Sequence, residues 1–310
     1  YEFCCGVASN IEDQEKYTFE QMLTNVMFAL AQSKEASSEN ICFFDEEVHK
    51  KKEFENFIES NMQQALDSQC FEMVLQPKID LQANSVIAAE ALVRWRLEDG
   101  TYLPPSSFVD IFEKNLFCSK LDFYMLKKAI QQIRKWIDMG MNPVNISVNQ
   151  SKIVFYHENY ISELKSLLEE YNVSGSYITL EVLESTVIED IDMFNSILTE
   201  VKKLGFSVSL DDFGSGYSSL NVLSKLQIDE LKIDRIFLHT KSEVDNQRTK
   251  WILESIIDIA KKSQILVVVE GVESKQDDLF IKNLGADVGQ GYFYGRPLSI
   301  SAFNDLIETK

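Results

Sequence analysis

The sequence predicts an α/β fold: a modified TIM (β/α)8 barrel with an antiparallel first strand, preceded by a short α+β segment. From residue 71 onward, short apolar runs of strand length alternate with amphipathic stretches of helical spacing. Gly140, Gly205 and Gly285 each follow a predicted helix and precede a strand, as in αβ connections. Only residues 78–85 join the first two strands. This link is too short for a helical crossover and predicts an antiparallel pair.

Eight apolar runs are predicted as the barrel strands. They cover residues 71–77, 86–95, 143–148, 177–184, 206–213, 229–234, 265–272 and 286–292. Amphipathic helices are predicted between most of them, for example over residues 120–140, 192–205 and 277–285. Eight strands with intervening helices are the arrangement of a (β/α)8 barrel.

The first 70 residues are organised differently. The pattern predicts strands over residues 2–9 and 41–45, a helix over 17–34, and a charged helix over 46–66. This segment is too small to form a stable domain alone. We therefore expect residues 1–54 to be the end of another domain with a linker helix, and residues 55–310 to form the barrel.

Composition excludes several classes of protein. The 310 residues carry a formal net charge of −19, so nonspecific binding to duplex nucleic acid or to an anionic membrane is not expected. The sequence contains no run of about 18 apolar residues, so no membrane span is predicted. Five cysteines without a CxxC pair favour buried thiols in a reducing compartment, and we expect a cytoplasmic location. Because the chain opens on Tyr1, we interpret it as part of a longer protein, whose upstream region could hold an anchor or a sensor.

Polar residues occur where the predicted strands end, and these ends build the active site of such a barrel. They are Glu90, Arg94, Asn145, Glu181, Glu184, Asp211, Asp212, Lys232, Glu270, Glu273 and Gln290. Glu90, Glu181 and Glu270 lie in strongly apolar contexts, where an unpaired carboxylate is costly. Carboxylates from several strands converge on one volume and need cations, and Lys232 supplies only one positive charge. Oxygen ligands without His or Cys favour Mg²⁺ or Mn²⁺ over zinc.

The adjacent Asp211 and Asp212 can bridge two metal ions at the end of their strand. Two ions about 3.5–4 Å apart are the usual device for activating water against a phosphodiester. Lys232 is then suited to orient that water, and Arg94 to grip a phosphate. Purely structural alternatives remain open at this point: Glu90 could pair with Lys232 or Arg94, and the two aspartates could cap the following turn.

Several phrases of the sequence occur together in an order that resembles one family. They are EALVRW (90–95), VNIS (144–147), LEVLES (180–185), DDFGSGYSSL (211–220), LKIDR (231–235), VEGVES (269–274) and QGYFYGRP (290–297). Over residues 55–305 they closely resemble the EAL-domain family of cyclic-di-GMP phosphodiesterases. The resemblance implies a modified TIM barrel that opens cyclic di-GMP to linear pGpG with Mg²⁺ or Mn²⁺.

The resemblance also implies a role for each matching residue. Metal ligands would be Glu90, Asn145, Glu181, Asp211, Asp212 and Glu270. Lys232 would hold the attacking water, with Asp212 and Glu270 beside it in the catalytic set. Gln76, Leu92, Arg94 and Gln290 would contact the dinucleotide, and Glu273 would steady the loop that begins at Asp211. A homodimer formed near this loop is expected.

The match has departures. No tyrosine precedes Gln76, Lys78 stands where the family prefers an aliphatic residue, and Leu183 replaces the usual threonine. None of these removes an implied metal ligand. The first 55 residues or so loosely resemble the C-terminal end of a GGDEF domain but lack its signature. We therefore expect no cyclase activity here, and an upstream GGDEF-like or sensor domain in the parent protein.

Three functions compete at this point. The leading one is metal-dependent hydrolysis of cyclic di-GMP. The second is a receptor that binds cyclic di-GMP without cutting it, which lost metal ligands would indicate. The third is an enolase- or aldolase-type barrel enzyme with Lys232 as base, against which the ordered family phrases argue.

Overall fold

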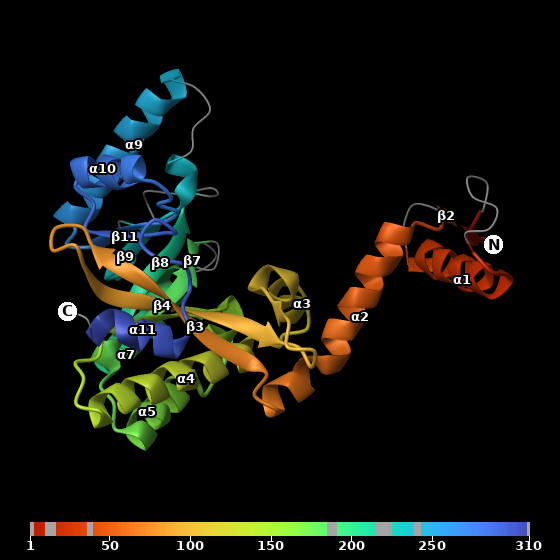
Figure 1. Cartoon of the computed structure of the whole chain (residues 1–310), viewed down its shortest axis with the longest axis horizontal. Helices are drawn as coiled ribbons and strands as arrows, with labels where there is room; N and C mark the ends of the chain where they lie inside the picture. The colour runs from red at the N-terminus through yellow and green to blue at the C-terminus, as the bar shows by residue number, and fades with distance from the viewer. Residues whose placement is uncertain are drawn as a thin grey trace. The chain divides into compact units, whose positions relative to one another are not determined.

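The computed structural model describes residues 3–9, 17–35, 40–184, 191–214, 223, 225–238 and 243–308 (Figure 1). The chain divides into two compact units, Tyr1–Gln64 and Ala65–Lys310. The division falls inside helix α2 (Glu46–Asp67), the same helix in which the boundary between residues 54 and 55 was expected. That functional boundary, with a domain remnant before it, stays a prediction.

The first unit contains a small parallel sheet with one helix packed on it. Strand β1 (Cys5–Val7) pairs with β2 (Ile41–Phe43), and helix α1 (Phe19–Glu35) connects them. A Cβ atom at Gly6 would lie 2.3 Å from the backbone nitrogen of Leu30, so only glycine allows this close approach of strand and helix. Helix α2 begins in this unit and continues to the barrel.

The second unit is a closed barrel of eight strands. They are β3 (Phe71–Asp80), β4 (Ser85–Arg96), β6 (Asn145–Gln150), β7 (Ile178–Leu183), β8 (Ser207–Phe213), β9 (Glu230–Ile233), β10 (Leu266–Val269) and β11 (Val288–Gln290). The order is β3-β11-β10-β9-β8-β7-β6-β4, and pairing of β3 with β4 closes the ring. Strand β3 is antiparallel to both neighbours, whereas the other barrel pairs are parallel. The predicted fold class is therefore confirmed. Strand β5 (Tyr102–Leu103) extends the edge beside β4.

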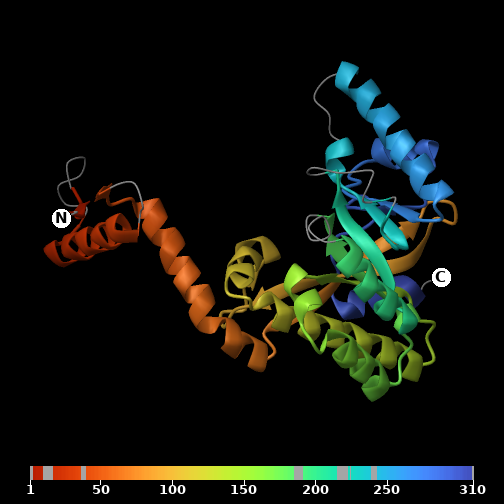
Figure 2. The ribbon, with the colours of Figure 1, turned by 180° about the vertical axis from the view of Figure 1, so that it is seen from behind.

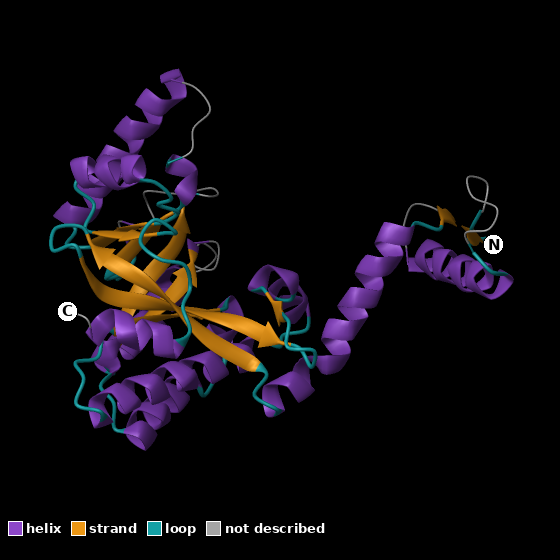
Figure 3. Ribbon diagram, in the orientation of Figure 1, coloured by secondary structure: helices purple, strands orange, loops and turns teal. Residues whose placement is uncertain are grey.

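Helices cover the outside of the strands, as Figures 2 and 3 show from opposite sides. The described ones in this unit are α3 (Val109–Lys114), α4 (Cys118–Asp138), α5 (Tyr160–Tyr171), α7 (Ile191–Lys203), α9 (Glu243–Lys262), α10 (Lys275–Leu284) and α11 (Ile300–Glu308). In α4, apolar residues at three- and four-residue spacing, from Leu121 to Trp136, are buried against the barrel. A capping box of Ser274 and Asp277 starts α10, and Gly285 ends it with a left-handed φ of 82°.

Strand β6 differs from its prediction in a way that matters for the site. The expected strand covered residues 143–148 and ended where the sequence turns polar. The observed strand begins at Asn145 and continues through Asn149 and Gln150, which pair with Glu181 and Val182 of β7. The apolar run ends at Val148, but the backbone ladder continues through these two polar residues.

The cysteines are less buried than the sequence predicted. All five cysteines are free thiols, but only Cys118 is buried, so the expectation of generally buried thiols was wrong. Across the described part of the chain, no helix combines the length and apolar character needed to cross a membrane.

Candidate active site

A cavity of about 230 Å³ opens at the carboxyl ends of the parallel strands. Its walls come from the ends of β3, β4, β8, β9, β10 and β11, as expected for a barrel of this type. The lining residues are Gln76, Glu90, Leu92, Asp211, Lys232, Arg235, Glu270, Gly271, Glu273, Gln290, Gly291 and Tyr292. Eight of the twelve residues placed here by the sequence motifs therefore line one cavity.

Lys232 of β9 lies at the centre of the carboxylates. Its Nζ is 2.8 Å from Glu181 Oε2 and 3.0 Å from Asp211 Oδ2. The same Nζ is 2.6 Å from Glu270 Oε1 and 3.6 Å from Glu90 Oε2. The lysine side chain is 1% exposed, so solvent contributes little to balancing these charges. One ammonium group therefore faces four carboxylates that come from four different strand ends.

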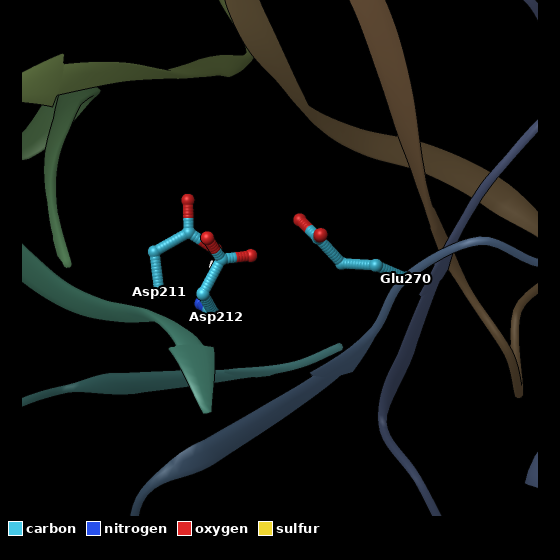
Figure 4. Close-up of side chains that lie close together, drawn as sticks. All are labelled: Asp211, Asp212 and Glu270. Carbon is cyan, nitrogen blue, oxygen red and sulfur yellow. Dashed lines mark hydrogen bonds between the residues drawn. The ribbon is translucent and has the colours of Figure 1, made fainter. Parts of the chain in front are cut away.

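Asp211 and Asp212 present both carboxylates to the same place, with Glu270 opposite them (Figure 4). One oxygen from each of the three residues lies within 4.8 Å of the others. Adjacent residues on a regular strand point to opposite faces. Here Asp212 has a left-handed φ of 57°, and the register with β9 shifts between Leu210 and Phe213. This irregularity turns the second carboxylate toward the first, at a backbone cost that aspartate bears better than most residues.

The pKa values show that the cluster holds more negative charge than it can balance. Burial raises the pKa of Glu270 to about 8, against the opposing effect of Lys232. Burial likewise raises the pKa of Glu90 and of Asp211. Glu181 is the exception: burial alone would raise its pKa, but the charges of Lys232 and Lys78 lower it to about 2. A divalent cation bound here would compete with protons for these carboxylate oxygens.

Asn145 does not lie at this site, and its expected placement was wrong. It is the first residue of β6, at the opposite end of the strand from the cavity. Its side chain donates to the Ser176 carbonyl over 3.2 Å and accepts from Thr179 Oγ1 over 2.8 Å. Asn149, four residues later, instead donates from Nδ2 to Glu90 Oε1 over 3.0 Å. Asn149 is thus the β6 amide within reach of the carboxylates, and it stands in a second VN-x-S phrase, residues 148–151, directly after the VNIS phrase.

The residues expected to contact substrate surround the carboxylates. Gln290 Nε2 donates to Glu90 Oε2 over 2.6 Å and to Gln76 Oε1 over 3.3 Å. Among the described residues, the buried Gln290 Oε1 has no hydrogen-bond partner. Leu92 lines the cavity, and Arg94 follows it on the same face of β4. Arg94 is partly buried and donates to the Val93 carbonyl, so its guanidinium does not form a wall of the cavity.

Comparison with known proteins identifies the family. The EAL-domain model matches residues 59–297. The chain belongs to the EAL-domain family. It is 33% identical over 288 residues to the cyclic di-GMP phosphodiesterase NbdA of Pseudomonas aeruginosa, covering 93% of this chain and 36% of NbdA. It is 28% identical over 300 residues to the cyclic di-GMP phosphodiesterase PdeR of Escherichia coli, covering 96% of this chain and 45% of PdeR. The chain thus spans less than half the length of these curated relatives.

Solved EAL structures share the fold. The complex of the PaMucR phosphodiesterase with c-di-GMP matches with a TM-score of 0.73 and 32% identity, over 79% of this chain and 99% of that one. The EAL enzyme Bd1971, bound to cAMP and cyclic-di-GMP, matches with a TM-score of 0.75 and 26% identity, over 95% and 77% of the two chains. The barrel therefore has the fold of an EAL domain.

Four further residues of this EAL domain line the cavity or lie beneath its carboxylates. The sequence motifs assigned no role to them. Arg235 and Tyr292 line the cavity, and Tyr292 stacks under Arg296, whose guanidinium carbon is 4.3 Å from the ring centroid. Lys78 and Glu230 form a buried ion pair of 2.8 Å beneath the carboxylates. The signal that could have found the last two is a charged residue directly beside apolar strand residues, Lys78 before Ile79 and Glu230 before Leu231.

Glu273 lines the cavity of the EAL domain, and its backbone N–H donates to Asp277 Oδ2 at the start of α10. The loop that it was expected to steady begins at Asp211, but residues 215–222 lie outside the described part of the chain. The loop-stabilising role of Glu273, and a dimer contact near that loop, remain predictions.

A partly buried acid anchors the segment that follows Asn149. Asp122 of α4 accepts hydrogen bonds from the backbone N–H and the hydroxyl of Ser151. Burial raises the pKa of Asp122 from 3.8 to about 7, although the Ser151 bonds oppose the shift. At pH values between 3.8 and about 7, Asp122 keeps its proton in the folded chain and releases it in the unfolded chain. The contribution of Asp122 to stability therefore falls as pH rises from about 4 to about 7.

We expect Asp122→Asn to remove this pH dependence, because the amide cannot ionise. We compare the free energy of unfolding of the variant with that of the unmodified chain. The difference, variant minus unmodified, should rise with pH between about 4 and about 7, by up to about 1 kcal/mol per pH unit. Urea unfolding at pH 5, 6, 7 and 8 measures the difference. A difference that stays constant with pH would show that Asp122 ionises in the folded chain as it does in the unfolded one.

Proposed function

We propose that this EAL domain hydrolyses cyclic di-GMP to linear pGpG with two divalent cations, Mg²⁺ or Mn²⁺, as cofactors. The observation that carries the proposal is the convergence of Glu90, Glu181, Asp211 and Glu270 on the buried Lys232, with the carboxylate of Asp212 beside those of Asp211 and Glu270. The names of NbdA and PdeR, and the cyclic di-GMP in the PaMucR complex, support the choice of substrate.

The charge of the cluster supports two ions rather than one. When ionised, the five carboxylates carry five negative charges and Lys232 carries one positive charge, which leaves four to be balanced. Two divalent cations supply that charge. The donors are carboxylate oxygens and the Asn149 amide, a hard oxygen set that suits Mg²⁺ or Mn²⁺.

Each residue then has a defined task. Bound ions would lower the pKa of a water molecule and neutralise charge on the phosphodiester. Glu90, Glu181, Asn149 and Asp211 would hold the first ion, and Asp211, Asp212 and Glu270 the second. Lys232, released from some of its ion pairs when cations arrive, would orient the attacking water. Cations held by Asp211, Asp212 and Glu270 would compete with the ammonium group of Lys232 for carboxylate oxygens and would so leave the lysine available for this task.

Substrate recognition falls to the rim of the cavity. Gln76 and Gln290 offer amide groups and Leu92 an apolar surface on the cavity wall. Arg94, outside that wall, would bring a guanidinium that suits a phosphate or the face of a base. Tyr292 adds an aromatic ring to the cavity lining, with the Arg296 guanidinium over it. We infer that this mixture of stacking surfaces and amides accommodates guanine bases beside the metal site.

A second candidate function is binding without hydrolysis. It is favoured by Lys232, whose contacts with Glu181, Asp211 and Glu270 balance part of the negative charge of the cluster. A chain held in this arrangement would bind cyclic di-GMP at the rim and relay the signal through partner contacts. A homodimer, an upstream GGDEF-like or sensor domain, and a cytoplasmic location all remain proposals, drawn from the resemblance and the composition.

Incubation of the chain with cyclic di-GMP and Mn²⁺, followed by chromatographic separation of the products, tests the proposal. We expect pGpG from the unmodified chain, no product in the presence of excess EDTA, and at least about 10³-fold less product from Glu90→Ala, which removes a proposed metal ligand. Tight binding of intact cyclic di-GMP without product, at any Mn²⁺ concentration, would instead establish the receptor function.

A further inference from the structure

Lys78 is a fully buried charge beneath the active site, and it does not line the cavity. It lies on β3, the antiparallel strand of the barrel, opposite Ala88 of β4 and Gln290 of β11. Its Nζ donates to Ser147 Oγ over 2.7 Å, to Glu181 Oε1 over 2.7 Å and to Glu230 Oε1 over 2.8 Å. These three bonds use the full donor capacity of the ammonium group.

Glu181 is held from both sides by different lysines. Its Oε1 accepts from Lys78 and its Oε2 accepts from Lys232. Lys232 also contacts three other carboxylates and faces the cavity, whereas Lys78 contacts no other proposed metal ligand. The last side-chain torsion of a glutamate rotates easily when its carboxylate has no partner. If cations draw Lys232 away, the hydrogen bond from Lys78 still fixes this torsion in Glu181.

The ion pair of Lys78 with Glu230 is poorly explained by stability alone. Replacing a buried ion pair by apolar residues of similar volume is often neutral or stabilising, because desolvation offsets the attraction of the charges. The Nζ of Lys78 instead contacts two carboxylates at once, Glu181 at 2.7 Å and Glu230 at 2.8 Å. Lys78 therefore places its ammonium group against one oxygen of Glu181.

We propose that Lys78, oriented by Glu230, is a positioning residue that fixes Glu181 in the orientation needed to bind the catalytic metal ion. The inference rests on the proposed function, since it assigns Glu181 to the metal site. Glu230 and Ser147 hold the lysine in place, and Lys78 in turn holds one oxygen of Glu181, so that the other oxygen stays directed at the centre of the cluster.

The test compares two variants by Mn²⁺ titration calorimetry and by thermal unfolding, both without substrate. Lys78→Met removes the bond to Glu181 and leaves Glu230 without its partner. The double variant Lys78→Met/Glu230→Leu removes the whole pair. Lys261→Met, which breaks an exposed ion pair with Asp287 outside the site, is the control and should bind Mn²⁺ as the unmodified chain does.

We expect Lys78→Met to bind Mn²⁺ about 10–100-fold more weakly, the usual effect of losing a partner that orients a metal ligand. It should also unfold at a lower temperature. The double variant should regain thermal stability, because no buried charge is left unpaired, but it should keep the weakened Mn²⁺ affinity. This separation of affinity from stability is the signature of a positioning role.

Three results would overturn the inference. Unchanged Mn²⁺ affinity in Lys78→Met would show that Glu181 needs no such support. Recovery of affinity in the double variant would show that Lys78 only balances Glu230. Failure of both variants to fold would assign Lys78 to the fold alone. An unmodified chain that binds no Mn²⁺ would instead refute the proposed metal site itself, and the inference with it.

Discussion

Lys232→Met is expected to hydrolyse cyclic di-GMP about 10²–10⁴-fold more slowly than the unmodified chain, the range typical for loss of a group that positions or moves a proton. Mn²⁺ binding should persist, because the variant keeps all five carboxylates and loses the cation that competes for their oxygens. Turnover under saturating Mn²⁺, together with Mn²⁺ calorimetry on the same preparation, measures both effects.

Asp211→Asn is the variant to compare with Lys232→Met, because it changes a carboxylate that accepts a hydrogen bond from Lys232. It should lose Mn²⁺ affinity and turnover together, as expected for a ligand. If Lys232→Met also lost Mn²⁺ binding, the lysine would be needed to assemble the site rather than to act on the water. Turnover unaffected by the loss of the lysine would exclude it from the reaction.

Asn149→Ala is expected to reduce hydrolysis by about 10²-fold or more, because its amide is the β6 group that contacts Glu90. Asn145→Ala, at the other end of the same strand, should leave hydrolysis within about twofold. It should instead lower the free energy of unfolding by about 1–2 kcal/mol, because it loses the bonds to Ser176 and Thr179.

The two asparagine variants control for each other, since they make the same substitution in one strand. Steady-state turnover with saturating Mn²⁺ and urea unfolding provide the readouts. The opposite result, with Asn145→Ala inactive and Asn149→Ala active, would restore the assignment made from the sequence and would contradict the register of β6.

Much of the fold could be read from the sequence because apolar runs and glycine stops are local signals. The short link over residues 78–85 correctly predicted that β3 and β4 are antiparallel. The predicted helices and strands of the barrel fall within a few residues of the observed ones. The error at β6 arose because polar Asn149 and Gln150 ended the apolar run before the backbone ladder ended. Two similar phrases, VNIS and VNQS, then offered two asparagines, and the alternation of residues along a strand could not choose between them.

The sequence by itself determined the family, the barrel, and the residue types that converge at the strand ends. Tertiary structure decided which atoms meet. It placed Asn149 rather than Asn145 beside Glu90, turned Asp212 toward Asp211 through a left-handed backbone, and buried Lys78 against Glu181. The physical reason is that contacts between strands depend on register and on single dihedral angles. A shift of a few residues leaves the local pattern of apolar and polar residues almost unchanged, but it moves a side chain from one end of the barrel to the other.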